Sequence, residues 1–428
     1  MASIDITPLS IFFSIFALAY LVALLYVLIF ERRHDCVELD ATDHVFSLIV
    51  PTHNEESVIA GCLDALLELD YSMDQVEILV VEDASTDRTA TVVSEYVERF
   101  PGRIAMCQVP ITEGGRGKAT ALNRAFRFLN ESSRFREDAK WIIGIFDGDG
   151  EPDANMLKKA SAQFRSPSVA GVQATVRIRN RAVSWLTRMQ DIEFAGFSRV
   201  TQIIRMRISH SAALGGNGQF VRASALKTVA IDLAEGVFWQ PDSLTEDLDL
   251  STRLVLQNWD LHHLSSSSVW QEGVETTKSL MNQRTRWAWG SLQVFVEYVL
   301  RLRILKTPDV RLGKRLDLVF NLSMFLVSPL VLVTWILSAF AFLGLVQIVA
   351  SFPTALMVLV SFGYLPVVAY GLVTVGGYRK SRIPLDLVGF AIYTYHWVPC
   401  LYVAMWRLLS RAGPVWLKTA REGEIAPS

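Results

Sequence analysis

The distribution of apolar residues along the chain separates two hydrophobic ends from a mixed middle. Residues 11–30 carry no charge and are long enough, at about 1.5 Å rise per residue, to cross a hydrocarbon core of roughly 30 Å. A second apolar zone follows Asp317 and divides into three candidate spans at residues 318–350, 353–377 and 385–409. The pattern therefore predicts an N-terminal transmembrane helix at residues 7–31 and C-terminal transmembrane helices within residues 317–410.

Charged residues beside these spans indicate their orientation. The only charge before the first span is Asp5, which favours a retained anchor over a cleaved signal peptide. Arg32 and Arg33 follow the span, so the positive-inside tendency places the next domain in the cytosol, together with the basic loop at residues 379–382. By parity the tail at residues 411–428 lies outside, whereas its basic residues favour the inside, and both alternatives remain open.

Residues 290–305, ahead of the second apolar zone, have apolar side chains at helical spacing together with Arg301 and Arg303. The region 290–316 is therefore assigned as an interfacial amphipathic helix region. An ordinary helix packed on the soluble domain explains the same pattern equally well.

The middle of the chain shows buried strands separated by helices. Apolar runs of strand length occur at residues 46–51, 76–81, 142–146 and 170–178. Helical periodicity occurs at residues 56–69 and 86–100. This alternation predicts a doubly wound α/β sheet, because continuous apolar runs are typical of parallel strands buried on both faces.

Polar and acidic residues follow three of these strands, at residues 52–55, 82–85 and 147–149. Ligands of doubly wound sheets bind beyond the carboxyl ends of the strands. One such loop is as well explained by solvated surface, but three converging loops favour a binding site. No G-x-G-x-x-G or Walker motif follows the first strand, which argues against a dinucleotide oxidoreductase and a P-loop NTPase.

Asp147 and Asp149 stand at alternate positions just after the third strand. Two carboxylates so placed can reach one Mg²⁺ or Mn²⁺, which would bridge to a diphosphate and stabilise the charge of a leaving nucleotide diphosphate. An Asp-x-Asp alone is a weak signal, and its place at the sheet edge strengthens it.

The composition indicates contact with a membrane and argues against a nucleic-acid partner. Hydrophobic residues make up 51% of the chain and charged residues 20%, with a mean hydropathy of +0.30, which indicates that part of the chain meets lipid. A net charge of −2 provides no basic excess, so no nucleic-acid partner is expected. The four cysteines lack C-x-x-C spacing and indicate neither a zinc site nor a disulfide framework.

Six motifs occur in order between residues 45 and 290. They are Pro51-Thr52-His53-Asn54-Glu55, Val81-Glu82-Asp83-Ala84-Ser85, Gly117-Lys118-Ala119-x-Ala121-Leu122-Asn123, Phe146-Asp147-Gly148-Asp149, Thr245-Glu246-Asp247 and Gln283-Arg284-Thr285-Arg286-Trp287. The set resembles glycosyltransferase family 2, and the last motif resembles the Q-x-x-R-W pattern of cellulose, chitin and hyaluronan synthases. The resemblance implies a cytosolic catalytic domain at residues 32–289 with a GT-A type doubly wound mixed sheet, joined to transmembrane α-helices.

The resemblance also implies a role for each matched residue. The nucleotide of a UDP-sugar is assigned to Thr52, Glu55, Asp83, Lys118, Asp147, Arg284 and Arg286, with Asp83 reading the uracil base. Asp147 and Asp149 are expected to bind Mg²⁺ or Mn²⁺. The acceptor is assigned to Glu246, Gln283 and Trp287, with the indole as a platform under the acceptor sugar. Asp247 is expected to be the general base that deprotonates the acceptor hydroxyl.

Two of these residues have simpler explanations. Asp247 precedes the helical run 248–256 and can be a helix N-terminal residue that interacts with the dipole. Trp287, close to Trp289, can belong to a membrane-interface belt. The glycine-rich stretch 215–220 stands where the family has an acceptor-lining segment, although its local pattern is loose.

These roles imply an inverting glycosyltransferase in a multi-pass arrangement in the cell membrane. Its expected partners are a UDP-sugar donor, membrane lipids, and a polysaccharide or lipid acceptor. The leading interpretation is a processive synthase that builds a β-linked polysaccharide and passes it through its own helices. The alternative is a transferase that adds one sugar to a diacylglycerol- or ceramide-type lipid. A channel or transporter with a nucleotide-binding domain does not account for the last two motifs.

Overall fold

The structure is a computed structural model that describes most of the chain. The described residues are 2–4, 40–110, 112, 114–135, 139–348 and 361–410, with scattered positions between 11 and 29. The predicted tail at residues 411–428, most of the predicted anchor at residues 7–31 and part of the predicted span at residues 353–377 lie outside them.

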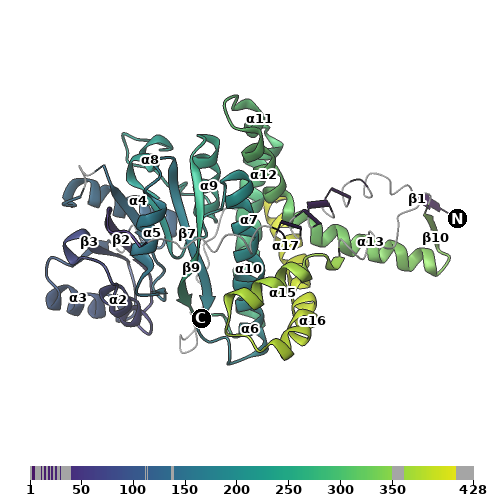
Figure 1. The fold of residues 1–428 in the computed structure, drawn as a ribbon, viewed down its shortest axis with the longest axis horizontal. Helices are drawn as coiled ribbons and strands as arrows, with labels where there is room; N and C mark the ends of the chain where they lie inside the picture. The colour runs from purple at the N-terminus through teal and green to yellow at the C-terminus, as the bar shows by residue number, and fades with distance from the viewer. Residues whose placement is uncertain are drawn as a thin grey trace.

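An eight-stranded sheet forms the centre of the α/β part (Figure 1). Its order is β4 (Ile104–Val109), β3 (Val76–Asp83), β2 (Val45–Thr52), β5 (Trp141–Ile145), β8 (Gln219–Arg222), β7 (Val169–Ile178), β9 (Asp260–Gln271) and β6 (Glu151–Pro152). The four predicted strands are β2, β3, β5 and β7. β2, β3, β4 and β5 run parallel, whereas β8 runs antiparallel to both of its neighbours, so the sheet is mixed.

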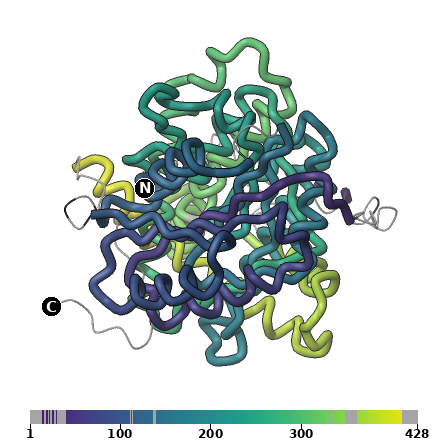
Figure 2. Tube along the Cα trace, turned by 90° about the vertical axis from the view of Figure 1, so that its left-hand side faces the viewer, coloured from purple at the N-terminus to yellow at the C-terminus, as the bar shows by residue number. Residues whose placement is uncertain are grey.

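Helices cover both faces of the sheet. One face packs against α4 (Lys118–Ser132), α8 (Ala223–Thr228) and α9 (Glu246–Leu256), and the other against α2 (Ile59–Leu67), α3 (Thr89–Arg99) and α5 (Met156–Gln163). Successive side chains of a strand alternate, so Ile49 joins the first core while Leu48 and Val50 join the second. In Figure 2 this half of the chain lies toward the viewer, and the green and yellow helices lie behind it.

A helical part adjoins the sheet near the ends of β7 and β9. It contains α6 (Trp185–Asp191), the π-helix η3 (Ile192–Ser198), α7 (Arg199–Ser209), α10 (Thr277–Phe295), α15 (Leu365–Val375), α16 (Ile383–Tyr393) and α17 (Trp397–Leu409). The η3 and α15 backbones touch, because a Cβ on Gly371 would lie 2.2 Å from the Gly196 carbonyl oxygen. α10 packs its apolar side chains against α17. The catalytic-domain elements and the C-terminal helices therefore share one packed interface.

The first part of the segment predicted as an interfacial region, residues 290–300, is packed on the α/β part. α10 continues into the π-helix η4 (Val296–Leu300), and Val294 and Tyr298 are buried in the core beside α9. This burial favours the packed-helix interpretation for residues 290–300. The chain then forms α11 (Arg303–Lys306) and α12 (Leu312–Ser323).

Among the described residues, Lys380–Leu409 is the one helical stretch that is long and apolar enough to cross a membrane by length and composition. It contains α16 and α17 and matches the predicted span at residues 385–409. The predicted span at residues 318–350 contains part of α12, a 3-10 turn and α13 (Val327–Phe342). In Figure 1, α13 projects from the body, and the short pair β1 (Ala2–Ile4) and β10 (Val346–Ile348) lies at its far end.

Candidate active site

A cavity of about 830 Å³ lies beyond the carboxyl ends of β2, β3 and β5. Its lining contains these predicted site residues: Thr52, Glu55, Asp83, Lys118, Asp147, Asp149, Glu246, Asp247, Gln283, Arg286 and Trp287. Residues from all six motifs therefore line one cavity, at the sheet edge where the strand order places a ligand.

The first end of the cavity is formed by the loops after β2 and β3. The Thr52 hydroxyl donates to the Val81 carbonyl at 3.2 Å, and His53 Nδ1 lies 2.6 Å from the Asp83 carbonyl oxygen. Asp83 Oδ1 accepts a hydrogen bond from the Gly115 amide at 3.2 Å. Burial raises the pKa of the Asp83 carboxyl. These bonds hold the two loops against each other.

Lys118 lies in the first turn of α4 and bridges two sides of the cavity. Its ammonium forms an ion pair with Asp147 and donates to the Gly216 carbonyl at 3.0 Å. Burial opposes its charge, but Asp147 and Glu246 outweigh that effect and raise the pKa of Lys118. Lys118 is therefore a fixed positive charge among the carboxylates.

Asp147 and Asp149 provide hard oxygen donors at the floor of the cavity. The Asp149 side chain is buried, and its Oδ2 accepts from the Glu272 amide at 2.9 Å. No group of three or more His, Cys, Asp or Glu side chains suited to a metal occurs among the residues that the structure describes. Two carboxylates nevertheless fit Mg²⁺ or Mn²⁺, since such ions commonly take one or two carboxylates and complete their shell with phosphate oxygens and water.

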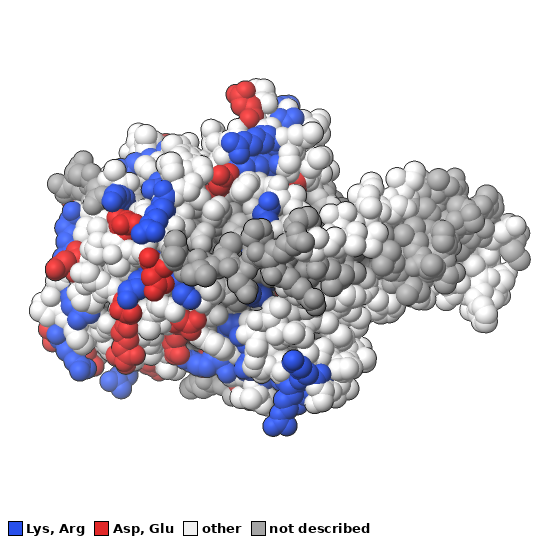
Figure 3. All heavy atoms as spheres, viewed as in Figure 1, with Lys and Arg blue, Asp and Glu red and all other residues white. Residues whose placement is uncertain are grey.

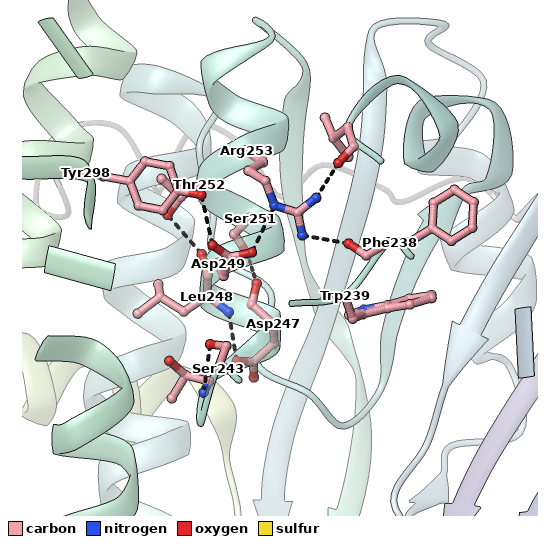
Figure 4. A network of polar contacts seen from close by, with 12 residues as sticks. Phe238, Trp239, Ser243, Asp247, Leu248, Asp249, Ser251, Thr252, Arg253 and Tyr298 are labelled. Atoms are coloured by element: carbon pink, nitrogen blue, oxygen red, sulfur yellow. Dashed lines mark hydrogen bonds and ion pairs between the residues drawn. The ribbon is translucent and has the colours of Figure 1, made fainter. Parts of the chain in front are cut away.

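Asp247 occupies the first turn of α9, which also contains Glu246 and Asp249. Figure 4 shows Asp247 and Asp249 with the contacts of each. Asp249 does not line the cavity. Its carboxylate accepts from Arg253 Nε at 2.8 Å and from the Tyr298 hydroxyl at 2.8 Å. Asp247 instead lines the cavity, and its Oδ1 accepts from the Leu248 amide at 2.7 Å. Asp247 therefore stands at the helix terminus and also faces the cavity, and its role as a base stays a prediction.

Glu246 is buried and Asp247 half-buried, and the two acids lie next to Lys118. Burial, followed by the charge of Asp247, raises the pKa of Glu246 to about 7. Burial also raises the pKa of Asp247, while Lys118 and the Leu248 amide oppose that rise. The negative charge of Asp247 thus favours the protonated form of Glu246, whereas Lys118 and the Leu248 amide favour the ionised form of Asp247 that a base needs.

The glycine-rich stretch closes one wall. Gly216 has φ +82°, and a Cβ there would lie 3.0 Å from Asp247 Oδ2 and 3.3 Å from Lys118 Nζ. A larger residue would meet both the backbone strain and these two side chains. The glycine-rich stretch, whose pattern in the sequence is loose, thus brings its backbone close to Asp247 and Lys118.

The last motif lies on α10, and its members point in different directions. Gln283, Arg286 and Trp287 line the cavity, and Arg286 Nη1 donates to the Leu244 carbonyl at 3.4 Å. Arg284 is fully buried outside this lining, and its Nη2 lies 2.6 Å from Glu193 Oε2. The assignment of Arg284 to the nucleotide is therefore corrected, because its guanidinium faces the helix interface and has a carboxylate partner there.

Two aromatic residues of the lining carry no motif in the sequence. Phe194 comes from η3, and Trp397 comes from the start of α17. They surround the Arg284 guanidinium with Trp287, whose ring centroid is 4.0 Å from Arg284 Cζ. Aromatic residues are frequent at positions 393–397, but such residues are also typical of membrane interfaces, so the sequence alone does not indicate this arrangement.

The comparisons with known proteins agree with this geometry. The family model described as Glycosyltransferase like family 2 matches residues 43–290. The Beta-monoglucosyldiacylglycerol synthase of Synechocystis sp. is 33% identical over 282 residues, which are 66% of this chain and 54% of that protein. The Poly-beta-1,6-N-acetyl-D-glucosamine synthase of Staphylococcus epidermidis is 25% identical over 292 residues, which are 67% of this chain and 65% of that protein. The chain thus spans about half the length of the first of these relatives.

Among solved structures, the mannosyltransferase PcManGT from Pyrobaculum calidifontis in complex with GDP-Man and Mn²⁺ superposes with a TM-score of 0.58 at 19% sequence identity. The alignment covers 94% of this chain and 99% of that one. This likeness supports a GT-A-like α/β fold with a mixed sheet. Because the family model matches more than half of the chain, the chain belongs to glycosyltransferase family 2.

Proposed function

We propose that the chain transfers a sugar from a UDP-sugar to an acceptor that reaches the cavity from the membrane. The observation that carries this proposal is one continuous cavity, lined at one end by Thr52 and Asp83 and at the other by Trp397. Trp397 belongs to the stretch Lys380–Leu409, which is long and apolar enough to cross a bilayer. An acceptor anchored in lipid would therefore meet the cavity where this helix contributes Trp397 to the lining.

The proposed reaction is a single displacement at the anomeric carbon. The acceptor hydroxyl oxygen forms a bond to that carbon while Asp247 takes the hydroxyl proton, and the bond to the diphosphate oxygen breaks. Arg286 donates to the leaving diphosphate, and Lys118 offsets part of the repulsion between the acidic pair and Asp147. Attack from the face opposite the leaving group inverts the anomeric centre and implies a β-linked product.

Donor binding is assigned to the loops after β2 and β3 and to the first turn of α4. Asp83 accepts from the uracil ring, Thr52 and Glu55 flank it, and Asp147 and Asp149 hold Mg²⁺ or Mn²⁺ against the diphosphate. The bound cation supplies neutralisation of the charge that develops on the leaving group. PcManGT, which shares the fold, holds Mn²⁺ together with GDP-Man, and this supports the same assignment here.

Transfer of one sugar to a diacylglycerol-type lipid is the acceptor chemistry that the relatives favour, since the relative at 33% identity is a Beta-monoglucosyldiacylglycerol synthase. A processive β-linked polysaccharide synthase is the second candidate. It is supported by the Q-x-x-R-W motif on α10 and by the Poly-beta-1,6-N-acetyl-D-glucosamine synthase relative. Glu246, Gln283 and Trp287 would contact the acceptor in either case.

The decisive experiment incubates the purified full chain in lipid vesicles with each radiolabelled UDP-sugar, with and without diacylglycerol. Label that partitions into organic solvent as one discrete species, and only when diacylglycerol is present, supports the lipid acceptor. Label in a polymer that gel filtration excludes supports the synthase. Absence of both products with every UDP-sugar would overturn the proposal.

We also propose a multi-pass protein of the cell membrane whose catalytic domain, residues 32–289, faces the cytosol. The basic loop at residues 379–382 lies beside α6 of that domain, which supports the same side for both. Protease added to intact cells should leave this domain uncut and should cut it after lysis. Cleavage in intact cells would reverse the proposed orientation.

A further inference from the structure

A second cavity, of about 440 Å³, lies where the loop between α15 and α16 meets α6. It is lined by Arg188, Gly377, Arg379, Ser381, Arg382 and Leu385. None of these residues lines the candidate active site. Three guanidinium groups therefore surround one space that the proposed reaction does not use.

The carboxylate beside this cavity leaves an excess of positive charge. Asp386 accepts from Arg188 Nε at 2.8 Å and Nη2 at 2.6 Å, and Arg382 Nε lies 3.5 Å from it. Arg379 and the adjacent Lys380 make no ion pair with any carboxylate that the structure describes. Asp386 thus pairs with two of the three arginines that line the cavity, and Arg379 is the third. Figure 3 shows Lys and Arg gathered at the lower edge of the molecule, below the region where α6 and α16 lie in Figure 1.

An exposed apolar face begins at the mouth of this cavity. Leu385, Val388 and Ile392 are 67%, 59% and 65% exposed, and their spacing of three and four residues places them on one side of α16. The half-exposed Trp185 lies against the same helix, because a Cβ on Gly389 would be 3.0 Å from its Nε1. Tryptophan is typical of the level where lipid head groups meet the hydrocarbon.

We propose that this cavity binds the phosphate of an anionic glycerophospholipid whose acyl chains lie along the Leu385–Val388–Ile392 face. Guanidinium forks match phosphate oxygens, and basic pockets between membrane helices on the cytosolic side suit anionic head groups. The apolar face favours a phospholipid over a free phosphate, because a free phosphate has no acyl chain that could contact this face. The inference rests on the proposed membrane position of α16 and is independent of the chemistry in the active site.

The test measures lipid binding to the purified full chain in a neutral detergent by native mass spectrometry. Phosphatidylglycerol should bind more tightly than phosphatidylcholine. The double variant Arg379→Gln, Arg382→Gln should weaken phosphatidylglycerol binding about tenfold or more, since it removes two charge-assisted contacts. The matched control is Arg301→Gln, Arg303→Gln, which removes two exposed guanidinium groups from the start of α11 and should leave binding unchanged.

Two further arms identify the ligand. Glycerol phosphate and inorganic phosphate should fail to displace phosphatidylglycerol at concentrations where unlabelled phosphatidylglycerol does. Displacement by either would mean a simple anion site and would overturn the lipid assignment. Equal loss in both double variants would also overturn it, because total charge would then decide binding. UDP binding and the melting temperature of each variant establish folding, and neither readout depends on transfer activity.

Discussion

Arg284 Nη2 lies 2.6 Å from Glu193 Oε2, and this ion pair joins α10 to the π-helix η3. The same carboxylate accepts from the Tyr393 hydroxyl at 2.9 Å and from Trp397 Nε1 at 3.2 Å. Since Arg284 also lies 4.0 Å from the ring centroid of Trp287, one ion pair orients both indoles that line the cavity. Glu193 and Arg284 are therefore positioning residues for the acceptor end.

Glu193→Gln should separate this positioning role from donor binding. The change keeps the shape of the side chain but leaves the Arg284 charge without its partner. We expect UDP affinity within about twofold of the wild type and transfer to the acceptor reduced about 10- to 100-fold. Calorimetric titration with UDP and an acceptor-dependent rate assay measure the two effects.

The control for Glu193→Gln is Asp317→Asn. It breaks the partly buried ion pair of Arg205 with Asp317, which joins α7 to α12 away from the cavity. Asp317→Asn should leave the acceptor-dependent rate near the wild-type value. Equal losses in the two variants would assign Glu193 to general stability.

Asp247→Asn should remove chemistry and preserve binding. The amide is nearly isosteric and can still occupy the first turn of α9, but it cannot accept the acceptor proton. We expect UDP affinity near that of the wild type and turnover reduced at least about a hundredfold. Single-turnover assays with bound UDP-sugar measure the chemical step. If the variant keeps most of its activity, Glu246 becomes the residue to test as the base.

Glu246→Gln should change the pH dependence of stability. Because burial raises the pKa of Glu246 to about 7, the folded chain holds a proton that the unfolded chain releases nearer the ordinary value. The resulting stability is present at low pH and is lost as pH rises through about 7. Relative to the wild type, the variant should therefore gain stability between pH 5 and pH 8, by on the order of 2–3 kcal/mol. Urea unfolding at both pH values measures this gain, and an equal effect at both would contradict it.

Variants of Arg286 and Trp287 should separate the effect on donor binding from the effect on transfer to the acceptor. A guanidinium binds the diphosphate, whereas an indole provides a stacking face for a sugar ring. Arg286→Ala should weaken UDP binding about tenfold or more. Trp287→Ala should leave UDP binding nearly intact and impair transfer. Equal loss of UDP binding in both variants would make the motif a structural element of α10.

Removal of the divalent cation should abolish transfer. Chelation is expected to stop the reaction, and added Mg²⁺ or Mn²⁺ to restore it. Asp149→Ala should reproduce the loss and should also lower the binding of Mn²⁺ in the presence of UDP, which electron paramagnetic resonance measures without any turnover. Full activity in excess chelator would contradict the assignment of Asp147 and Asp149.

The strands that could be predicted are those whose apolar sequence pattern matches their burial in the folded sheet. β2, β3 and β5 are apolar runs buried on both faces, so their sequences alone identify them. β8 has four residues and follows a glycine-rich stretch, and β9 contains a run of serines, so neither has a strand pattern. Their place in the sheet depends on pairing with β7, which involves contacts distant in sequence.

The same distinction applies to the site. The donor end follows from the ends of predicted strands, and motif order was enough to bring Thr52, Asp83 and Asp147 together. The acceptor end depends on packing between helices about a hundred or more residues apart. Arg284 was assigned to the nucleotide, together with Arg286, because the resemblance of their motif to the family implied it. The helical rotation that turns it toward Glu193 is visible only once η3 and α17 are in place.

The shared lining of the cavity has a consequence for recombination between relatives. Trp287 is carried by the family domain, at residues 43–290, but Trp397 is carried by α17, far beyond its end. A chimera that receives only the family domain from another parent inherits that parent's donor loops and half of its acceptor wall. The other half of the proposed acceptor wall, which contains Trp397, still comes from the recipient. From the proposed acceptor role of both indoles, we expect a parent's acceptor preference to be transferred intact only when α10 and α17 are exchanged together.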